Sequence, residues 1–176
     1  MRVRNEHLSD QRIVFCGAGS AAVGIADMIC AGIADEHSMT TDEARKLVWM
    51  CDSRGLVTKT RKSGVEEHKL PYCRDEAPAA ELLEVVKRVK PTILIGASGH
   101  AHTFTREVVA EMYKHCAQPV IFALSNPTTK AECTAEEAYN WTGGNAIFAS
   151  GSPFPPVRID GRIFVPGQGN NMFIFP

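Results

Sequence analysis

The chain has 176 residues, which is enough for one domain with a substantial core and short for two. Its apolar fraction of 44% and charged fraction of 22% are ordinary for a globular protein. A formal net charge of -1 argues against a nucleic-acid or membrane-surface partner, because either usually requires a basic excess. No apolar run approaches the roughly 20 residues that cross a bilayer, and residues 1–11 lack the apolar core of a secretory signal. We expect an intracellular protein, cytoplasmic or organellar.

The first half of the chain predicts two strands with helices between them. Residues 12–16 are a short apolar run that ends at glycine, as a buried strand does, and apolar residues over 20–34 recur at helical spacing. A capping box that begins at Thr40 predicts a short second helix over 41–46. The run over 47–52 is the next predicted strand.

The second half continues the alternation of strands and helices. In chain order we expect a helix over 79–89, a strand over 92–99, a helix over 105–116, a strand over 119–127, a helix over 136–141 and a strand over 146–152. Thr134 and Glu137 repeat the capping signature. Apolar strands that are each followed by a helix predict an α/β fold, a doubly wound parallel sheet of the Rossmann type. We expect a short lead over 1–11, one domain over 12–176, and ordered loops from Gly151 to the end.

The cysteines and histidines predict no metal site. The six cysteines are scattered without a C-x-x-C pair, so we interpret them as free, mostly buried thiols. His100 and His102 share a strand face but have no nearby third histidine or carboxylate.

The turn after the first strand carries a dinucleotide-binding pattern. Gly17, Gly19 and Ala22 fit G-x-G-x-x-G/A between a strand and a helix, where they permit a tight turn, close approach of a pyrophosphate and close helix packing. The phosphates would then lie over free N–H groups at the positive end of the helix. Glycine-rich turns also arise for packing alone, but this one stands in the right context.

Residues at and after the second strand leave the choice of dinucleotide open. Asp52 ends that strand, where an acid commonly binds the adenosine ribose, and it favours NAD because it repels a 2′-phosphate. A basic cluster that follows could instead neutralise a 2′-phosphate, or could be a solvated loop balanced by Glu66 and Glu67. The cluster contains Arg54, Lys59, Arg61, Lys62 and Lys69.

Neutral amides follow two later predicted strands. Ser125 and Asn126 come directly after one strand, and Asn170 and Asn171 stand behind two glycines. Such groups suit a hydroxy-carboxylate or a nicotinamide. They are also ordinary turn formers, so taken singly they favour turn chemistry.

Taken together, the segments resemble the NAD(P)-binding domain of the malic enzymes. The matching stretches are "IVFCGAGSAAVGIA", "VWMCDSRGL", "KPTILIGASG", "PVIFALSNPTTKAECTAEEAY", "AIFASGSPFPPV" and "PGQGNNMFIFP". They run in family order and cover the chain from about residue 12 to its end. "GHAHTF" departs from the pattern, which usually has small or aliphatic residues where His100 and His102 stand. An amino-acid dehydrogenase on the same fold would not explain "ECTAEEAY" or "PGQGNN".

The resemblance implies oxidative decarboxylation of L-malate to pyruvate and CO2, with reduction of NAD or NADP and with Mg2+ or Mn2+ required. It places Gly17, Gly19, Ser20, Ala21 and Ala22 at the pyrophosphate, Asp52 at the adenosine ribose, Ser53 and Lys69 at a 2′-phosphate, Ser98 at the cofactor, Asn126 at both cofactor and substrate, and Asn170 and Asn171 at the substrate. Ser53 and Lys69 favour NADP over NAD.

The resemblance also implies what this chain does not carry. The general-acid tyrosine, the catalytic lysine and the metal-binding carboxylates of the family lie upstream of the glycine-rich turn, so we expect no catalytic residue and no metal ligand here. We expect a domain that is incomplete at both ends relative to the family. Two hypotheses follow: the cofactor half of a malic enzyme, a homo-oligomer when complete, or a catalytically inactive dinucleotide-binding fragment.

Overall fold

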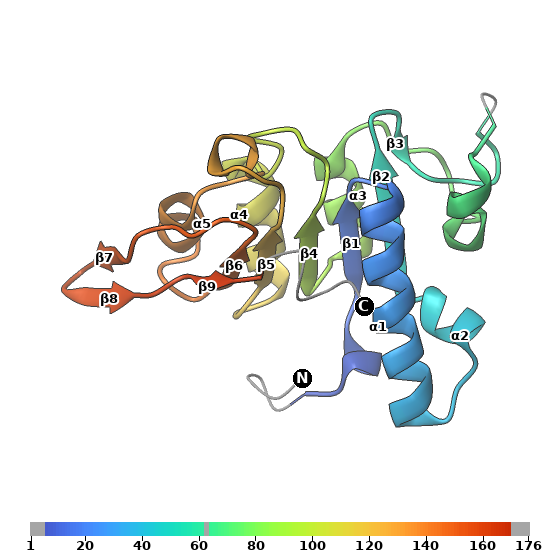
Figure 1. Ribbon diagram of the computed structural model, residues 1–176, viewed down its shortest axis with the longest axis horizontal. Coiled ribbons are helices and arrows are strands. Elements are labelled where there is room, and N and C mark those ends of the chain that lie inside the picture. Colours follow the sequence, from blue (N-terminus) through green and yellow to red (C-terminus); the bar gives the residue numbers. More distant parts are fainter. Residues whose placement is uncertain (1–5, 62–63, 170–176) are drawn as a thin grey trace.

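A computed structural model describes residues 6–61 and 64–169 (Figure 1). The strands of the main sheet are β1 (Ile13–Cys16), β2 (Val48–Asp52), β3 (Gly55–Leu56), β4 (Ile93–Gly96), β5 (Val120–Ala123), β6 (Ile147–Ser150) and β9 (Gly167–Gln168). The α-helices are α1 (Ser20–His37), α2 (Thr41–Arg45), α3 (Leu82–Val89), α4 (Arg106–His115) and α5 (Ala135–Trp141). Short 3-10 turns are η1 (Leu8–Asp10), η2 (Glu67–Tyr72) and η3 (Thr128–Lys130).

The sheet has the doubly wound order that the sequence predicts. Its strands run β3-β2-β1-β4-β5-β6-β9, so the chain turns to one side of β1 for β2 and to the other side for β4. β1 pairs in parallel with both of these strands, and β4, β5 and β6 continue the parallel pairing. Only β3 pairs antiparallel among the strands assigned to this sheet in the described chain. The predicted α/β fold is confirmed.

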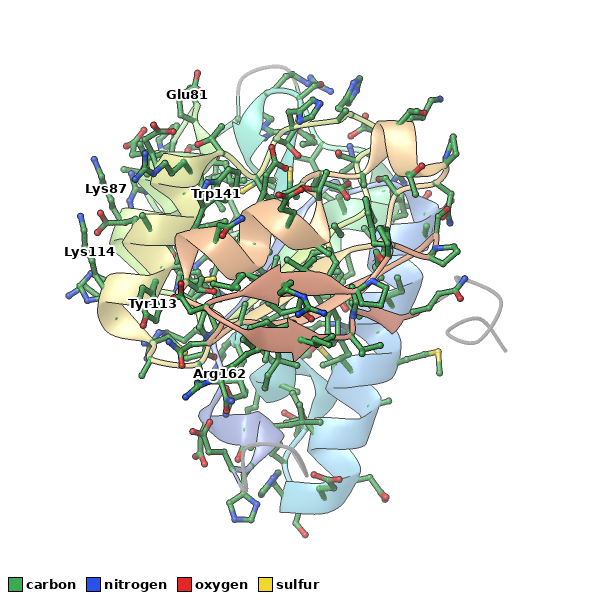
Figure 2. All side chains as sticks on the ribbon, turned by 90° about the vertical axis from the view of Figure 1, so that its left-hand side faces the viewer. Glu81, Lys87, Tyr113, Lys114, Trp141 and Arg162 are labelled. Atoms are coloured by element: carbon green, nitrogen blue, oxygen red, sulfur yellow. The ribbon has the colours of Figure 1, made fainter. Side chains whose placement is uncertain are left out.

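Helices cover both faces of the sheet because alternate strand residues point to opposite sides. Val14 of β1 packs in the core beneath α3, α4 and α5, whereas Ile13 and Phe15 pack in the core beneath α1. Figure 1 shows α1 on the near face of the sheet, beside β1 and in front of β2. Viewed from the β6 side, Lys87 of α3 and Lys114 of α4 point away from the sheet (Figure 2).

Both predicted capping boxes are present. Thr40 Oγ1 accepts a hydrogen bond from the Glu43 amide at 3.2 Å, and the Glu43 carboxylate accepts one from the Thr40 amide at 2.7 Å. Thr134 and Glu137 repeat the arrangement at the start of α5. Each box satisfies two amide donors that a helix start leaves without partners.

The prediction of loops from Gly151 onward was wrong for part of that segment. Strands β7 (Val157–Ile159) and β8 (Arg162–Phe164) form an antiparallel hairpin, and β9 extends the main sheet beside β6. The hairpin turns at Asp160 and Gly161, which both have positive φ (47° and 78°). Asp-Gly is one of the pairs that a two-residue hairpin turn with positive φ at both positions favours, and the surrounding prolines and glycines hide this signal in the sequence. Residues 170–176 lie outside the described chain.

The cysteine prediction is confirmed. All six cysteines are free, and four of them are buried. Within residues 6–61 and 64–169, no helix is both long and apolar enough to span a bilayer.

Candidate dinucleotide-binding cleft

An open cleft of about 350 Å³ lies at the carboxyl ends of β1, β2 and β4, where the strand order reverses. Its walls are the turn over residues 17–19, the end of β2 with Asp52 and Ser53, Lys69 from η2, and the loop after β4 with Ser98. Open parallel sheets bind ligands at such a reversal point. The fold therefore brings most of the predicted cofactor residues to one place.

The glycine-rich turn is shaped both for packing and for an approaching ligand. Gly17 has a φ of +113°, and a Cβ atom there would overlap the carbonyl of Ala97, so only glycine fits. A Cβ atom on Gly19 would meet no atom within 4 Å, so this position faces open space. Ala22 is fully buried in the core beneath α1, where a small residue permits close packing.

Helix α1 begins at this turn with free donors. Gly19 is its N-cap residue and supplies no side-chain cap, and the amides of Ser20, Ala21 and Ala22 belong to the first turn, where no intrahelical acceptor exists. Their N–H groups add to the positive end of an 18-residue helix. This arrangement suits a phosphate group.

Asp52 is a largely buried carboxylate that is already neutralised. Its side chain is 11% exposed, and its Oδ2 atom lies 2.6 Å from Arg61 Nη1 and 3.2 Å from Lys69 Nζ. Its Oδ1 atom accepts the Arg54 amide at 2.9 Å. Burial works to raise the pKa of Asp52, but the hydrogen bonds from Arg61, the Arg54 amide and Lys69 outweigh it and hold the pKa below its ordinary value.

The basic cluster divides into residues with different roles in the structure. Arg61 is 8% exposed and also donates to the carbonyls of Gly55 and Leu56, at 2.9 and 2.8 Å, so its guanidinium is engaged inside the protein. Lys69 lies at the cleft wall between Asp52 and Glu66.

Around Asp52, three cations face two carboxylates. Arg54 contacts Glu66 at 3.4 Å, and Arg61 and Lys69 contact Asp52. This corner of the cleft can therefore accept a further negative charge more readily than a lone aspartate would. Lys62 lies outside the described residues.

Asn126 follows β5 but does not line the cleft itself. Its side chain is exposed, and its Oδ1 atom accepts a hydrogen bond of 2.5 Å from Ser152 Oγ after β6. The amide NH2 is left as a donor, which suits a carboxylate or a carbonyl oxygen. Asn170 and Asn171 lie outside the described residues.

Three neighbouring features were missed from the sequence. Glu132 is fully buried and binds the loops after β4 and β5. The sequence shows this residue within "AECTAEEAY" but predicts no role for it. The sequence places Arg61 in a basic cluster, for a 2′-phosphate or for a solvated loop, whereas the structure makes it the partner of Asp52. His68 Nε2 lies 3.2 Å from the carbonyl of Ala18, so η2 packs on the glycine-rich turn. Only the fold brings each pair together.

The remaining polar groups of the cleft supply no metal centre. Within residues 6–61 and 64–169, no group of three histidine, cysteine or acidic side chains could hold a metal ion. His100 lines the cleft. Burial raises the pKa of Cys16, at the floor of the cleft, to about 11, so it stays a protonated thiol near neutral pH.

Comparisons with known proteins identify the family of this domain. Residues 1–176 match the family described as malic enzyme, NAD binding domain. The chain is 52% identical over 169 residues to NADP-dependent malic enzyme 4, chloroplastic, of Arabidopsis thaliana, and 54% identical over 171 residues to NADP-dependent malic enzyme of Dictyostelium discoideum. Each alignment covers 96% of this chain but only 26% and 31% of those proteins.

Solved structures show the same fold. A crystal structure of a putative malic enzyme and that of an NAD-dependent malic enzyme from Thermotoga maritima both superpose with a TM-score of 0.64. They are 21% and 20% identical to this chain, and each match covers 97% of it and 38% of the other protein.

Proposed function

Because the chain belongs to the malic enzyme family, whose NAD-binding domain it matches, we propose that it binds NADP and supplies the cofactor part of the oxidative decarboxylation of L-malate to pyruvate and CO2. The observation that carries the choice of NADP is the ion-paired state of Asp52. Arg61 neutralises this carboxylate, and Lys69 stands beside it at the cleft wall. A 2′-phosphate would then meet cations rather than an unpaired anion.

The cofactor residues fit the chemistry of each part of the dinucleotide. Gly17 and Gly19 make room for the pyrophosphate, and the amides of Ser20, Ala21 and Ala22 donate to it. We assign the adenosine ribose to Asp52 and its 2′-phosphate to Ser53 and Lys69.

The order of the strands supports an assignment for the nicotinamide half. β4 and β5 lie beyond β1 on the side away from β2. We therefore assign this half to Ser98 in the loop after β4 and to Asn126 in the loop after β5. When bound, NADP accepts the hydride from the carbon that bears the malate hydroxyl.

We assign malate to the amide groups of Asn126, Asn170 and Asn171. An amide NH2 can donate to a substrate carboxylate without adding charge to the site. The described residues do not fit a divalent metal, so no step through Mg2+ or Mn2+ is assigned to them. We assign the metal, the general-acid tyrosine and the catalytic lysine that the family resemblance implies to the complete enzyme.

The alternative is a dinucleotide-binding fragment without catalysis.

We propose that the complete enzyme is homo-oligomeric and acts in the cytoplasm or an organelle; two relatives, from Arabidopsis thaliana and Solanum lycopersicum, are described as chloroplastic. We expect the 176 residues alone to bind cofactor and not to oxidise malate.

Titration of the purified chain with NADPH and, separately, NADH tests the cofactor assignment. We expect NADPH to bind about 10- to 100-fold more tightly, which corresponds to one charge-assisted contact of about 1.5–3 kcal/mol. Tighter binding of NADH would refute the NADP preference. Failure of a folded chain to bind either cofactor would refute the proposed binding function. If the same chain reduces NADP with malate in the presence of Mg2+, the isolated chain is an enzyme.

A further inference from the structure

The most thoroughly buried charged side chain near the cleft belongs to Glu132, in the segment that joins η3 to α5. Its exposed fraction is 0%. It lies over the last residue of β4, Gly96, where an added Cβ atom would overlap the Glu132 side chain. Glycine at the end of this strand therefore leaves the space that the Glu132 side chain occupies. Burying such a group is costly unless hydrogen bonds compensate for the lost water.

Ser98 and Ser125 supply the hydrogen bonds that compensate for the burial of the Glu132 carboxylate. Glu132 Oε1 accepts the Ser98 amide at 3.0 Å, the Ser98 hydroxyl at 3.0 Å and the Ser125 hydroxyl at 2.5 Å. Glu132 Oε2 accepts the Ser125 amide at 3.3 Å. Four donors therefore meet this carboxylate, three of them at Oε1 and one at Oε2.

The same hydroxyls extend the network to two further amides. Ser125 Oγ accepts the Gly99 amide at 2.9 Å, and Ser98 Oγ accepts the His100 amide at 3.1 Å. Each hydroxyl thus accepts from the backbone. Ser125 Oγ donates to Glu132, and the single proton of Ser98 Oγ has two acceptors in reach, Glu132 Oε1 at 3.0 Å and the His100 carbonyl at 3.3 Å. Three successive amides of the loop after β4, at residues 98, 99 and 100, are drawn toward one carboxylate directly or through one hydroxyl. The loop after β5 is fixed by the same atoms.

This network determines what the loops offer to a ligand. The Ser98 amide is engaged by Glu132, and the Gly99 and His100 amides are engaged by the two serine hydroxyls, so these three amides cannot serve as a second phosphate site like the start of α1. Glu132 binds Ser98, at the cleft wall, and it binds Ser125, the residue that precedes Asn126. With the adenosine end at β2 and the pyrophosphate at β1, the strand order leaves the loops after β4 and β5 for the other nucleoside.

We propose that Glu132 is a positioning residue of this site, which fixes the loops after β4 and β5 in the geometry that binds the nicotinamide half of the cofactor. The inference rests on the proposed binding of NADP. It predicts that a change at Glu132 affects ligands according to which end of the dinucleotide they contain. A purely structural residue would affect them all alike.

The test compares NADPH with adenosine 2′,5′-bisphosphate, which carries the adenosine end without the nicotinamide. Glu132→Gln keeps the shape of the side chain but places an NH2 group against two serine donors. We expect its affinity for NADPH to fall about 10-fold, while its affinity for the bisphosphate changes less than about 2-fold. The control Glu136→Gln removes an exposed carboxylate four residues further on and should change neither affinity.

The outcomes separate the two proposals. An equal loss of affinity for both ligands, or no loss for either, would overturn the positioning role while leaving NADP binding intact. If the unaltered chain binds neither ligand, the proposed function fails and the inference fails with it. Should Glu132→Gln not fold, Ser125→Ala removes one hydroxyl of the same network and must show the same split between NADPH and the bisphosphate; an equal effect on both would overturn the role.

Discussion

Arg61 Nη1 lies 2.6 Å from Asp52 Oδ2, and the two side chains are 8% and 11% exposed. The guanidinium also closes the β2–β3 turn through two carbonyl groups. One arginine therefore fixes the turn and removes the charge that would repel a 2′-phosphate. Because the pair is largely buried, the loss of one partner leaves the other without compensation, which costs more than the pair itself contributes.

Replacement of Arg61 by glutamine should destabilise the chain and weaken its binding of NADPH. Lys69 and the Arg54 amide still contact Asp52, so we expect a loss of about 2–3 kcal/mol in the free energy of unfolding, below the full cost of an unpaired buried charge. Urea denaturation measures it. Arg106→Gln, at the exposed start of α4, is the matched control and should stay within about 0.5 kcal/mol of the parent. Equal stabilities of the two variants would contradict the role of Arg61.

Replacement of Lys69 by glutamine should separate the two cofactors. A charge-assisted contact to a phosphate contributes about 1.5–3 kcal/mol, so the affinity for NADPH should fall about 10- to 100-fold. NADH lacks the 2′-phosphate and should bind within about 2-fold of the parent. Lys59→Gln, in the same basic segment, is the control. Loss of NADH binding to the same degree would show that Lys69 supports the pocket rather than reads the phosphate.

The depressed pKa of Asp52 predicts a specific acid sensitivity. A carboxylate whose folded pKa lies below its unfolded value contributes stability that is present above the unfolded pKa, about 4, and is lost as the pH falls through the folded pKa. The free energy of unfolding of the parent should therefore fall more steeply below pH 4 than that of Asp52→Asn. Denaturation curves at several pH values compare the slopes, and parallel slopes would contradict the assignment. The exposed carboxylates are common to both proteins and cancel.

The capping box at Thr40 offers a change that should affect stability alone. Thr40→Ala removes the side-chain acceptor for the Glu43 amide at the start of α2, which typically costs about 1 kcal/mol. Thr40 does not line the cleft, so NADPH should bind as it does to the parent. Thr128→Ala, an exposed threonine outside a cap, should cost less than about 0.5 kcal/mol. A matching loss in this control would show that the cap contributes nothing special.

The sequence predicted most of the fold because its signals are local. Strand runs that end at glycine, helical spacing and the threonine–glutamate boxes all act over a few residues. β3 is only two residues long and η2 contains a proline, so neither has a periodic pattern.

The site was predicted less completely than the fold. The glycine pattern located the turn, but the partners of Asp52 and Glu132 come from irregular loops. Arg61 lies nine residues from Asp52, and Glu132 lies 34 residues from Ser98. No rule of residue spacing predicts such pairs, because only the tertiary structure brings the two residues together.

The two glycines of the turn should respond to alanine in opposite ways. At Gly17 a methyl group would overlap the Ala97 carbonyl on a backbone with φ of +113°, so Gly17→Ala should destabilise the chain by more than about 2 kcal/mol. At Gly19 the φ is -77° and no atom lies within 4 Å of the added carbon, so the chain should keep its stability within about 0.5 kcal/mol.

The variant that keeps its stability should lose affinity for the cofactor. The methyl group of Gly19→Ala would occupy the space that we assign to the pyrophosphate, so its affinity for NADPH should fall at least about 10-fold. Calorimetric titration beside thermal unfolding measures both quantities on one sample. If Gly19→Ala binds NADPH as tightly as the parent, the pyrophosphate does not approach the backbone at Gly19, and the open space there has another cause.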